Sequence, residues 1–506
     1  MLLVLKFSSV IKQALFFICL SMFMLIPAIS SAQWIQLGMD LDGELAGDQS
    51  GFWVAMNASG NRVGVGAPRN SGNGSNSGQV RVYERNGALW TQLGADIDGE
   101  NAFDQSGTAL SINTAGDRLA IGSRLNNGNG TNAGHVRVFQ WNGTAWSQMG
   151  SDIGGVASGD EFGSSVSLNG LGNRLAVGAE GNDINGLNSG HVRIYEWNGT
   201  AWTQLGQDIY GDSLNDNSGF AVSFNSMGNR LAIGTPLNDG NGRDAGQVRI
   251  FDWNGTAWVQ VGADIDGEAA GDRSGSSISL NAFGNQVAIG APFNNGNGGN
   301  AGHVRAYRWN GTTWIQVGTD IDGEAFDDNC GTSVSMNTSG TRIAVGSQLN
   351  SGNGYRSGHV RLYEWNGTAW IQIGSDLDGE AANDWSGKSI SINAAGNQVA
   401  VGAWLNDGNG NEAGHVRVFE YNLPTNITKV ETQESFSVYP NPAKDIITLE
   451  TQNSIGEVAQ INSITSALLL EFRIVKEKEK LDVSELQNGI YFLKVGELTK
   501  KVIISK

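Results

Sequence analysis

Short stretches in which apolar and polar residues alternate recur along most of this chain, and each is bounded by Gly, Asn or Asp. One typical unit contains four such stretches, Trp258–Val261, Gly275–Leu280, Gln286–Ile289 and His303–Trp309. Alternation with a period of two residues between turn signals predicts β-strands, and an Asn-Gly pair after the fourth stretch predicts a tight hairpin. Each unit therefore predicts four short antiparallel strands.

The unit occurs seven times at a constant spacing without insertion or deletion, which is marked by Trp34, Trp90, Trp146, Trp202, Trp258, Trp314 and Trp370. A long constant period indicates a repeat architecture, and four antiparallel strands per repeat are typical of a β-propeller blade. We predict an all-β protein with a seven-bladed β-propeller over residues 33–422. The alternative, a right-handed β-helix, has much shorter coils.

The phase of the repeat predicts how the ring closes. The first repeat opens with an outer strand at Trp34, whereas the last ends with the strand His415–Tyr421, where the next Trp strand would be due. Pairing these two strands would complete the seventh blade and remove two exposed sheet edges. The N-terminal outer strand should therefore close the propeller.

Residues 1–32 have the pattern of a secretory signal peptide. Lys6 and Lys12 flank a nearly continuous apolar run over 14–29, and Ser30-Ser31-Ala32 offers a cleavage site. A retained membrane anchor is the alternative, but the run is shorter than the roughly 20 residues of a spanning helix. We expect cleavage and a mature chain without a transmembrane span.

Charge and cysteine content exclude several classes of function. The net charge of −18 argues against nucleic acid and against an anionic membrane surface as partners. Cys19 lies in the predicted signal, and Cys330 stands where five other repeats have Ser and one has Phe162. Cys330 is therefore interpreted as a serine-sized substitution, and no intramolecular disulfide is expected.

Half of the 50 acidic residues, 25 in number, gather in the loop that follows each Trp strand. Five repeats carry four carboxylates at relative positions 1, 3, 5 and 9: Asp40/Asp42/Glu44/Asp48, Asp96/Asp98/Glu100/Asp104, Asp264/Asp266/Glu268/Asp272, Asp320/Asp322/Glu324/Asp328 and Asp376/Asp378/Glu380/Asp384. The third repeat keeps only Asp152 and Asp160, and the fourth keeps Asp208, Asp212 and Asp216.

Two interpretations of these loops stay open. Oxygen ligands at alternate positions around a Gly turn are typical of Ca²⁺ sites, so calcium is the one cofactor we consider. Alternatively, the first and last Asp, which all seven repeats share, cap turns and pair with a recurrent arginine. That arginine is Arg81, Arg137, Arg193, Arg249, Arg305, Arg361 or Arg417, according to the repeat.

We expect ligand-binding residues at positions where the repeats differ from one another. The five histidines share one repeat position with Gln79 and Gln247, and Gln is a poor zinc ligand or general base, so they are interpreted as structural. Loops of the sixth and seventh repeats carry unrepeated residues that could stack on and hydrogen-bond a sugar: Trp385, Trp404, Tyr355 and Arg356. Scattered exposed aromatic residues without a function are the alternative.

Three segments of the third repeat, Phe162–Ser167, Arg174–Ala179 and Gly190–Tyr195, resemble the FG-GAP repeats of integrin α-chain-type propellers. The resemblance extends over all seven repeats and implies a seven-bladed propeller of a kind often used for extracellular binding. Calcium-binding members of that family carry an Asp-rich loop between the first two strands of a blade. Here the corresponding connection is the short turn Asn281–Asn285, so their calcium ligands are not transferred.

The C-terminal part differs in composition: Lys388 is the only lysine between residues 33 and 425, and nine lysines follow. Residues 423–433 are interpreted as a linker and residues 434–506 as a second domain. Tyr439-Pro440-Asn441-Pro442-Ala443, Gly489–Val495 and the Lys-rich end resemble the C-terminal sorting domain of type IX secretion cargo in Bacteroidota. That resemblance implies a small β-sandwich, recognition by the export machinery, and a route through the periplasm to the cell surface or medium. The alternative is a second binding domain of immunoglobulin type.

Together these features predict a secreted or surface-displayed binding or adhesion protein, a monomer without catalytic residues, whose partner is an extracellular glycan or protein. Catalysis needs an asymmetric group of acids and bases, whereas nearly every ionisable residue here is repeated around the ring. The alternative is an extracellular polysaccharide-active enzyme built on a propeller scaffold.

Overall fold

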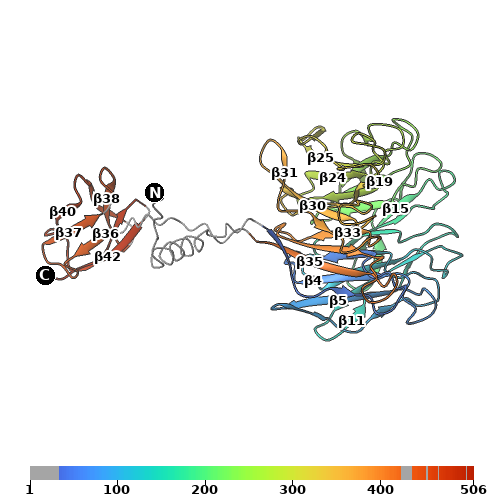
Figure 1. The fold of residues 1–506 in the computed structure, drawn as a ribbon, viewed down its shortest axis with the longest axis horizontal. Coiled ribbons are helices and arrows are strands. Elements are labelled where there is room, and N and C mark those ends of the chain that lie inside the picture. Colours follow the sequence, from blue (N-terminus) through green and yellow to red (C-terminus); the bar gives the residue numbers. More distant parts are fainter. Residues whose placement is uncertain (1–32, 423–435, 452–453, 465–466, 497) are drawn as a thin grey trace, which may run out of the picture. The chain divides into compact units, whose positions relative to one another are not determined.

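The computed structural model describes residues 33–422, 436–451, 454–464, 467–496 and 498–506 (Figure 1). These fall into two compact units, one over residues 33–422 and one over the described part of 436–506. The predicted signal peptide, residues 1–32, and the predicted linker, residues 423–433, lie outside the described residues. Every regular element within the described ranges is a β-strand, which confirms the all-β class, and none is a helix able to cross a membrane.

The first unit consists of seven antiparallel sheets, each with the same order of strands. The inner strands are β3 (Trp53–Met56), β8 (Ala109–Ile112), β13 (Ser165–Leu168), β18 (Ala221–Phe224), β23 (Ser277–Leu280), β28 (Cys330–Met336) and β33 (Ser386–Ile392). The second strands are β4 (Arg62–Ala67), β9 (Arg118–Ser123), β14 (Arg174–Ala179), β19 (Arg230–Thr235), β24 (Gln286–Ala291), β29 (Arg342–Ser347) and β34 (Gln398–Ala403).

The outer half of each sheet follows the same plan. The third strands are β5 (Gln79–Asn86), β10 (His135–Trp141), β15 (His191–Trp197), β20 (Gln247–Trp253), β25 (His303–Trp309), β30 (His359–Trp365) and β35 (His415–Asn422). Their outer partners are β6 (Leu89–Gln92), β11 (Trp146–Gln148), β16 (Trp202–Gln204), β21 (Trp258–Gln260), β26 (Trp314–Gln316), β31 (Trp370–Gln372) and β1 (Gln33–Gln36).

A two-residue strand then pairs with the same third strand, so the outer edge of each sheet is in two pieces. These short strands are β7 (Ile97–Asp98), β12 (Ile153–Gly154), β17 (Ile209–Tyr210), β22 (Ile265–Asp266), β27 (Ile321–Asp322), β32 (Leu377–Asp378) and β2 (Leu41–Asp42). The alternating pattern did not predict them. Between β6 and β7, Gly94 adopts a φ of 84°, and a Cβ there would lie 2.8 Å from Trp141. Only Gly takes this left-handed conformation readily, so the strand breaks here.

The two ends of the first unit pair with each other. Strand β1 runs antiparallel to β35 with Trp34 opposite Tyr421, and the Trp34 indole Nε1 donates to the carbonyl of Ile373 at 2.9 Å. A closed circuit of seven backbone hydrogen bonds links the turns that follow the inner strands of neighbouring sheets. It runs through Ala58, Thr114, Gly170, Ser226, Ala282, Thr338 and Ala394, and back to Ala58. The junction between the last and first sheets is therefore bonded like the other six.

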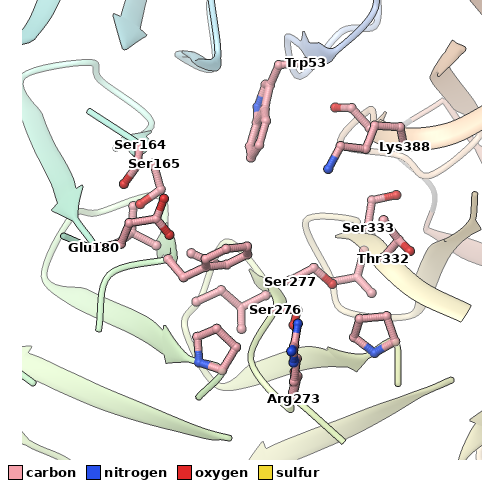
Figure 2. A pocket seen from close by; sticks show the side chains of 18 of the residues that line it. Trp53, Ser164, Ser165, Glu180, Arg273, Ser276, Ser277, Thr332, Ser333 and Lys388 are labelled. Atoms are coloured by element: carbon pink, nitrogen blue, oxygen red, sulfur yellow. The ribbon is translucent and has the colours of Figure 1, made fainter. Parts of the chain in front are cut away.

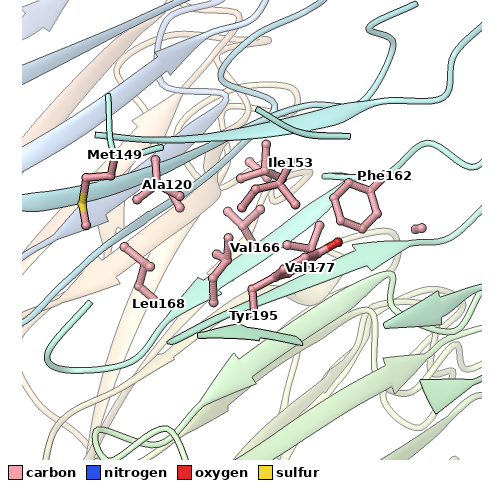
Figure 3. Close-up of a cluster of buried hydrophobic side chains, with 13 residues drawn as sticks. Ala120, Met149, Ile153, Phe162, Val166, Leu168, Val177 and Tyr195 are labelled. Carbon is pink, nitrogen blue, oxygen red and sulfur yellow. The ribbon is translucent and has the colours of Figure 1, made fainter. Parts of the chain in front are cut away.

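Small residues in the inner strands allow the sheets to approach one another. A Cβ on Gly122 would overlap the carbonyl oxygen of Gly163 in the next sheet. The backbone amide of Leu168 donates to Ser111 Oγ of the preceding sheet at 2.9 Å, which satisfies a group that the inner edge would leave unpaired. Between the sheets lie apolar clusters, one of which surrounds Phe162 and Val166 (Figure 3).

The second unit is a β-sandwich of two sheets. One contains β36 (Phe436–Tyr439), β37 (Ile446–Thr451) and β40 (Lys478–Asp482), and the other contains β39 (Leu468–Arg473), β38 (Val458–Ser463), β41 (Gly489–Val495) and β42 (Leu498–Ile504). Buried residues from both sheets form one core.

The Tyr439–Ala443 motif is held against the last strand of this unit. The Asn441 amide nitrogen donates to the Lys501 carbonyl at 2.8 Å, and the backbone amide of Ile503 donates to Asn441 Oδ1 at 2.8 Å. Ala443 is buried in the core. The motif and the Lys-rich C-terminal end therefore form one bonded structure.

Candidate ligand-binding site

A cavity of about 440 Å³ lies at one end of the ring of inner strands (Figure 2). Its walls come from residues at the start of the inner strands and just after the second strands, where the long loops of each repeat begin and end. A smaller cavity of about 220 Å³ at the opposite end is lined by the short turns after the inner strands. The larger cavity is the better candidate because its size lies within the range of small-molecule sites.

The walls of the larger cavity differ from repeat to repeat, mainly at three repeat positions. The first, at the start of the inner strand, holds in chain order Phe52, Thr108, Ser164, Phe220, Ser276, Thr332 and Lys388. The second, which directly follows it, holds Trp53, Ala109, Ser165, Ala221, Ser277, Ser333 and Ser389. The third, just after the second strand, holds Pro68, Arg124, Glu180, Pro236, Pro292, Gln348 and Trp404. A backbone with sevenfold repetition thus presents an asymmetric set of side chains at one place.

Four charged side chains line the cavity: Arg124, Glu180, Arg273 and Lys388. The Lys388 Nζ lies 5.3 Å from the centre of the Phe52 ring. Its side chain forms no ion pair or hydrogen bond with any residue in the described part of the chain. Burial, together with the charge of Arg124, lowers the pKa of Lys388. Lys388 and Arg273 therefore both lack a carboxylate partner among the described residues, and each lies against an aromatic ring.

Arg124 is shared by two carboxylates. Its Nη1 lies 3.4 Å from Glu161 Oε2 and 3.7 Å from Glu180 Oε1. Burial, and to a lesser extent the charge of Glu161, raises the pKa of Glu180 to about 7, although Arg124 acts in the opposite direction. Glu180 therefore holds a proton during part of the neutral pH range.

The variant Glu180→Gln should be more stable than the wild type at pH 8 by about 1–3 kcal/mol, and no more stable at pH 4. The folded protein keeps the Glu180 proton up to about pH 7, whereas the unfolded chain loses it near 4.5. In the wild type, the stabilisation that comes from protonated Glu180 is therefore present at low pH, and it is lost as the pH rises from about 4.5 through about 7. The sixth repeat has Gln348 at the same position, so the substitution suits the backbone. Urea unfolding of both proteins at several pH values measures the difference; a difference independent of pH would contradict the assignment.

The four candidate residues from the loops of the last two repeats lie together. The Trp385 and Trp404 rings are 5.7 Å apart at 81°, and the Arg356 guanidinium lies 5.2 Å from the Tyr355 ring centre and 6.0 Å from that of Trp385. We call these four residues the aromatic rim. The Trp404 ring also meets Phe52, a cavity residue, at 5.3 Å and 89°. The aromatic rim is thus continuous with the wall of the cavity, and its role in ligand binding stays a prediction.

The carboxylates of each acidic loop contact different partners. In the sixth repeat, Asp320 Oδ1 accepts from Gln316 Nε2 at 2.6 Å, and the recurrent arginine pairs with the third carboxylate, as Arg361 Nη1 does with Glu324 at 3.4 Å. The expectation that the arginine pairs with the first and last Asp is therefore wrong in most repeats. The register of the third strand places the arginine beside the middle of the loop.

The last carboxylate of each loop has a structural role. In the first repeat, Asp48 Oδ2 accepts from the Leu45 amide at 2.9 Å and from Asn70 Nδ2 at 3.1 Å. The equivalent bonds recur around the ring. Within the described residues, all five of these side chains are buried and none belongs to a group that could hold a metal ion: Asp48, Asp104, Asp272, Asp328 and Asp384. They cap turns because the chain folds back over them, away from the other carboxylates.

The structure brings two carboxylates to one histidine, and in three of the four groups the carboxylates come from different loops. Four such groups could hold a metal ion: Asp40/Asp42/His415, Glu100/His135/Asp152, Glu268/His303/Asp320 and Glu324/His359/Asp376. Where Gln replaces His, Gln79 Nε2 donates to Glu44 at 3.1 Å and to Asp98 at 3.5 Å. Gln79 therefore donates hydrogen bonds to two loops, and the histidines at the equivalent positions lie beside carboxylates of these loops. Calcium binding by the remaining carboxylates stays a prediction.

Sequence reasoning missed most of the cavity: Phe52, Trp53, Arg124, Glu180, Arg273 and Lys388. Trp53 and Lys388 lie near the beginning of the inner strands β3 and β33, and the other four lie in the connections next to strands. The sequence around each of them is that of an ordinary strand end. The signal that could have found them is the comparison of equivalent positions across the seven repeats, since the positions of Lys388 and Glu180 vary in charge and size from one repeat to the next.

Comparison with known proteins bears on both units. Residues 437–506 match the family model of the secretion system C-terminal sorting domain. The second unit is a type IX sorting domain. It marks the chain for export across the outer membrane to the cell surface or extracellular space. Residues 154–195 match the FG-GAP repeat, which agrees with the blade pattern of the first unit.

The other comparisons add little. No curated protein sequence matches the chain. Among solved structures, a proposed 6-phosphogluconolactonase from Bacteroides uniformis is similar with 11% identity and a TM-score of 0.46, over 65% of this chain and 85% of that one. The periplasmic gluconolactonase PpgL of Pseudomonas aeruginosa is similar with 14% identity and a TM-score of 0.45, over the same shares of the two chains.

Proposed function

We propose that the protein is an exported, non-catalytic glycan-binding protein, and that its ligand enters the cavity lined by Trp53, Lys388 and Glu180. The observation that carries this proposal is the chemistry of the cavity wall, where hydroxyl groups and aromatic rings occur together at positions that differ from repeat to repeat. A site on the exported part of a surface protein is accessible to extracellular glycans.

The wall hydroxyls are oriented to accept hydrogen bonds. Ser276 Oγ donates to the Arg273 carbonyl at 2.7 Å, and Thr332 Oγ1 donates to the Asn329 carbonyl at 2.7 Å. A hydroxyl that has used its proton keeps two lone pairs, so these oxygens can receive the protons of sugar hydroxyls. The Trp53 ring points into the same cavity (Figure 2), where it can cover the apolar face of a sugar ring.

The variant Trp53→Ala should bind its glycan about tenfold more weakly than the wild type, because a central aromatic anchor is lost. Ala occupies the same position in the second and fourth repeats, as Ala109 and Ala221, so the fold tolerates it. The chain from Gln33 to Lys506 is first applied to a glycan array, and the best ligand is then titrated by calorimetry.

Two matched variants show whether a loss of binding is specific to the cavity. Arg243→Ala removes a side chain that is 88% exposed and does not line the cavity, and should bind like the wild type. Trp385→Asn changes the aromatic rim to the residue of the fourth and sixth repeats, Asn217 and Asn329. Loss of binding in Trp385→Asn with full binding in Trp53→Ala would move the site from the cavity to the rim.

A polysaccharide-active enzyme is the second candidate, and Glu180 is the observation that favours it. A carboxyl whose pKa is raised to about 7 beside a second carboxylate, Glu161, has the properties of a general acid. Incubation of the bound glycan with the chain, followed by analysis of the products, separates the two functions. Cleavage that Glu180→Gln abolishes while binding persists would establish an enzyme and contradict the non-catalytic proposal.

A further inference from the structure

We infer that the ligand of the cavity is an acidic glycan and that Lys388 binds its carboxylate. This inference rests on the proposed function and names the class of ligand that the cavity selects. It starts from the residue that differs most from its counterparts, since the other six repeats have Phe, Thr or Ser at the position of Lys388.

The position of Lys388 suits an anion-binding group. It is the only lysine between residues 33 and 425, although lysine is common in the second unit. Its amino group points into the open part of the cavity, with Glu180 on the facing wall (Figure 2). An ammonium that is partly removed from water without a counter-ion is unfavourable, and an entering carboxylate relieves that cost. The cavity therefore gains stability when an anion occupies it.

The charge balance of the cavity also favours an anion. Its lining holds three cationic side chains, Lys388, Arg273 and Arg124, and one carboxylate, Glu180, which takes up a proton near neutral pH. Arg124 is engaged by two glutamates, and the Arg273 guanidinium lies 4.7 Å from the centre of the Phe293 ring. The chain as a whole carries a net charge of −18. A cationic cavity in an acidic protein directs anions to that cavity.

The remaining wall argues for a saccharide that bears the anion. The hydroxyl oxygens of Ser276 and Thr332 accept protons, which a ligand with many hydroxyl groups supplies. The Lys388 ammonium, which lies against the Phe52 ring and has no carboxylate partner among the described residues, can pair with a carboxylate of the ligand. Burial lowers the pKa of Lys388, and a bound carboxylate would raise it again, so binding should weaken as the pH rises.

The test compares an oligosaccharide that carries one glucuronate with its carboxyl-reduced neutral twin and with a sulfated twin. Each is titrated into the wild-type chain from Gln33 to Lys506 and into Lys388→Thr, Lys388→Arg and Arg243→Ala. Thr stands at the same position in the second and sixth repeats, as Thr108 and Thr332, so Lys388→Thr restores a residue that this backbone already carries. Melting curves confirm that each variant is folded.

The wild type should prefer the glucuronate form over the neutral twin by about tenfold or more, which is the usual contribution of a charge-assisted hydrogen bond. Lys388→Thr should lose that preference, Lys388→Arg should keep most of it, and Arg243→Ala should leave it unchanged.

Equal binding of the acidic and neutral twins, unaffected by Lys388→Thr, would overturn the acidic ligand but leave glycan binding in place. A preference for the sulfated twin alone would overturn the carboxylate. Failure of the wild type to bind any of the three, or any glycan on the array, would overturn the proposed function and this inference together.

Discussion

Deletion of Trp34–Gly38, which removes three of the four residues of strand β1, should lower the free energy of unfolding of the propeller by about 5 kcal/mol or more. Trp34 is 5% exposed, and loss of a buried aromatic side chain costs about 3–5 kcal/mol. The deletion also removes three of the four residue pairs with β35 and the indole hydrogen bond to Ile373, and each hydrogen bond contributes about 1 kcal/mol. The third strand of the seventh sheet would become an exposed edge, so aggregation should accompany the loss of stability.

Two further variants define the cause of that loss. Ile35→Ser changes a side chain of the same strand that is 49% exposed, and should alter stability by less than about 0.5 kcal/mol. Gln33 lies directly opposite Asn422 in the register of β1 and β35, so a disulfide between cysteines at these positions should raise the melting temperature. An unchanged melting curve after the deletion would show that the terminal strand does not close the ring.

Phe162→Ser should destabilise the propeller by about 3–5 kcal/mol, even though five repeats have Ser at this position. Phe162 is completely buried and packs edge-to-face against Tyr195, with ring centres 6.4 Å apart (Figure 3). Elsewhere the recurrent arginine fills part of this space, as Arg249 Nη2 does at 3.4 Å from Ser218 Oγ. In the third repeat that arginine, Arg193, pairs with Asp208 instead, at 2.7 and 2.6 Å. A serine at 162 would therefore leave a cavity.

A second substitution should recover part of this loss. In most repeats the arginine pairs with an acidic residue at the third loop position, but the third repeat has Val156 there. Adding Val156→Glu to Phe162→Ser should draw Arg193 back toward position 162 and restore about 1 kcal/mol or more. Cys330→Ser is the matched control and should cost less than about 1 kcal/mol, because the volume hardly changes. A loss of similar size in Phe162→Ser and Cys330→Ser, measured by urea unfolding, would contradict this account.

The regular part of the fold could be predicted from the sequence because a single period governs it. The alternation of residues in Gln286–Ile289 and His303–Trp309 predicts strands that the structure contains as β24 and β25. The structural role of Gln79 and its His counterparts also follows from their exchange within one repeat position, because both residues lie beside carboxylates of the acidic loops. The Gly at the end of each Trp strand signals a turn, but its effect, the break between β6 and β7, depends on the packing of Trp141 from the neighbouring sheet.

The candidate site could not be predicted in the same way because its contacts join different repeats. Arg124 and Glu180 stand at the same position of consecutive repeats, and the sequence places neither beside a cavity. The acidic loops mislead for the same reason, since Glu324 and Asp376 meet at His359 although they belong to different loops. A periodic sequence does not determine in which direction a side chain points or how neighbouring sheets are aligned with each other.

The central claim is that the asymmetric cavity inside the ring is the ligand site, and a crystal structure of the chain with a glucuronate-bearing oligosaccharide tests it most directly. We predict that the sugar lies in the cavity, with its carboxylate within about 4 Å of Lys388 Nζ and a sugar ring against Trp53. An oligosaccharide bound at the aromatic rim around Tyr355, or outside the ring on the acidic loops, with the cavity empty, would contradict the account.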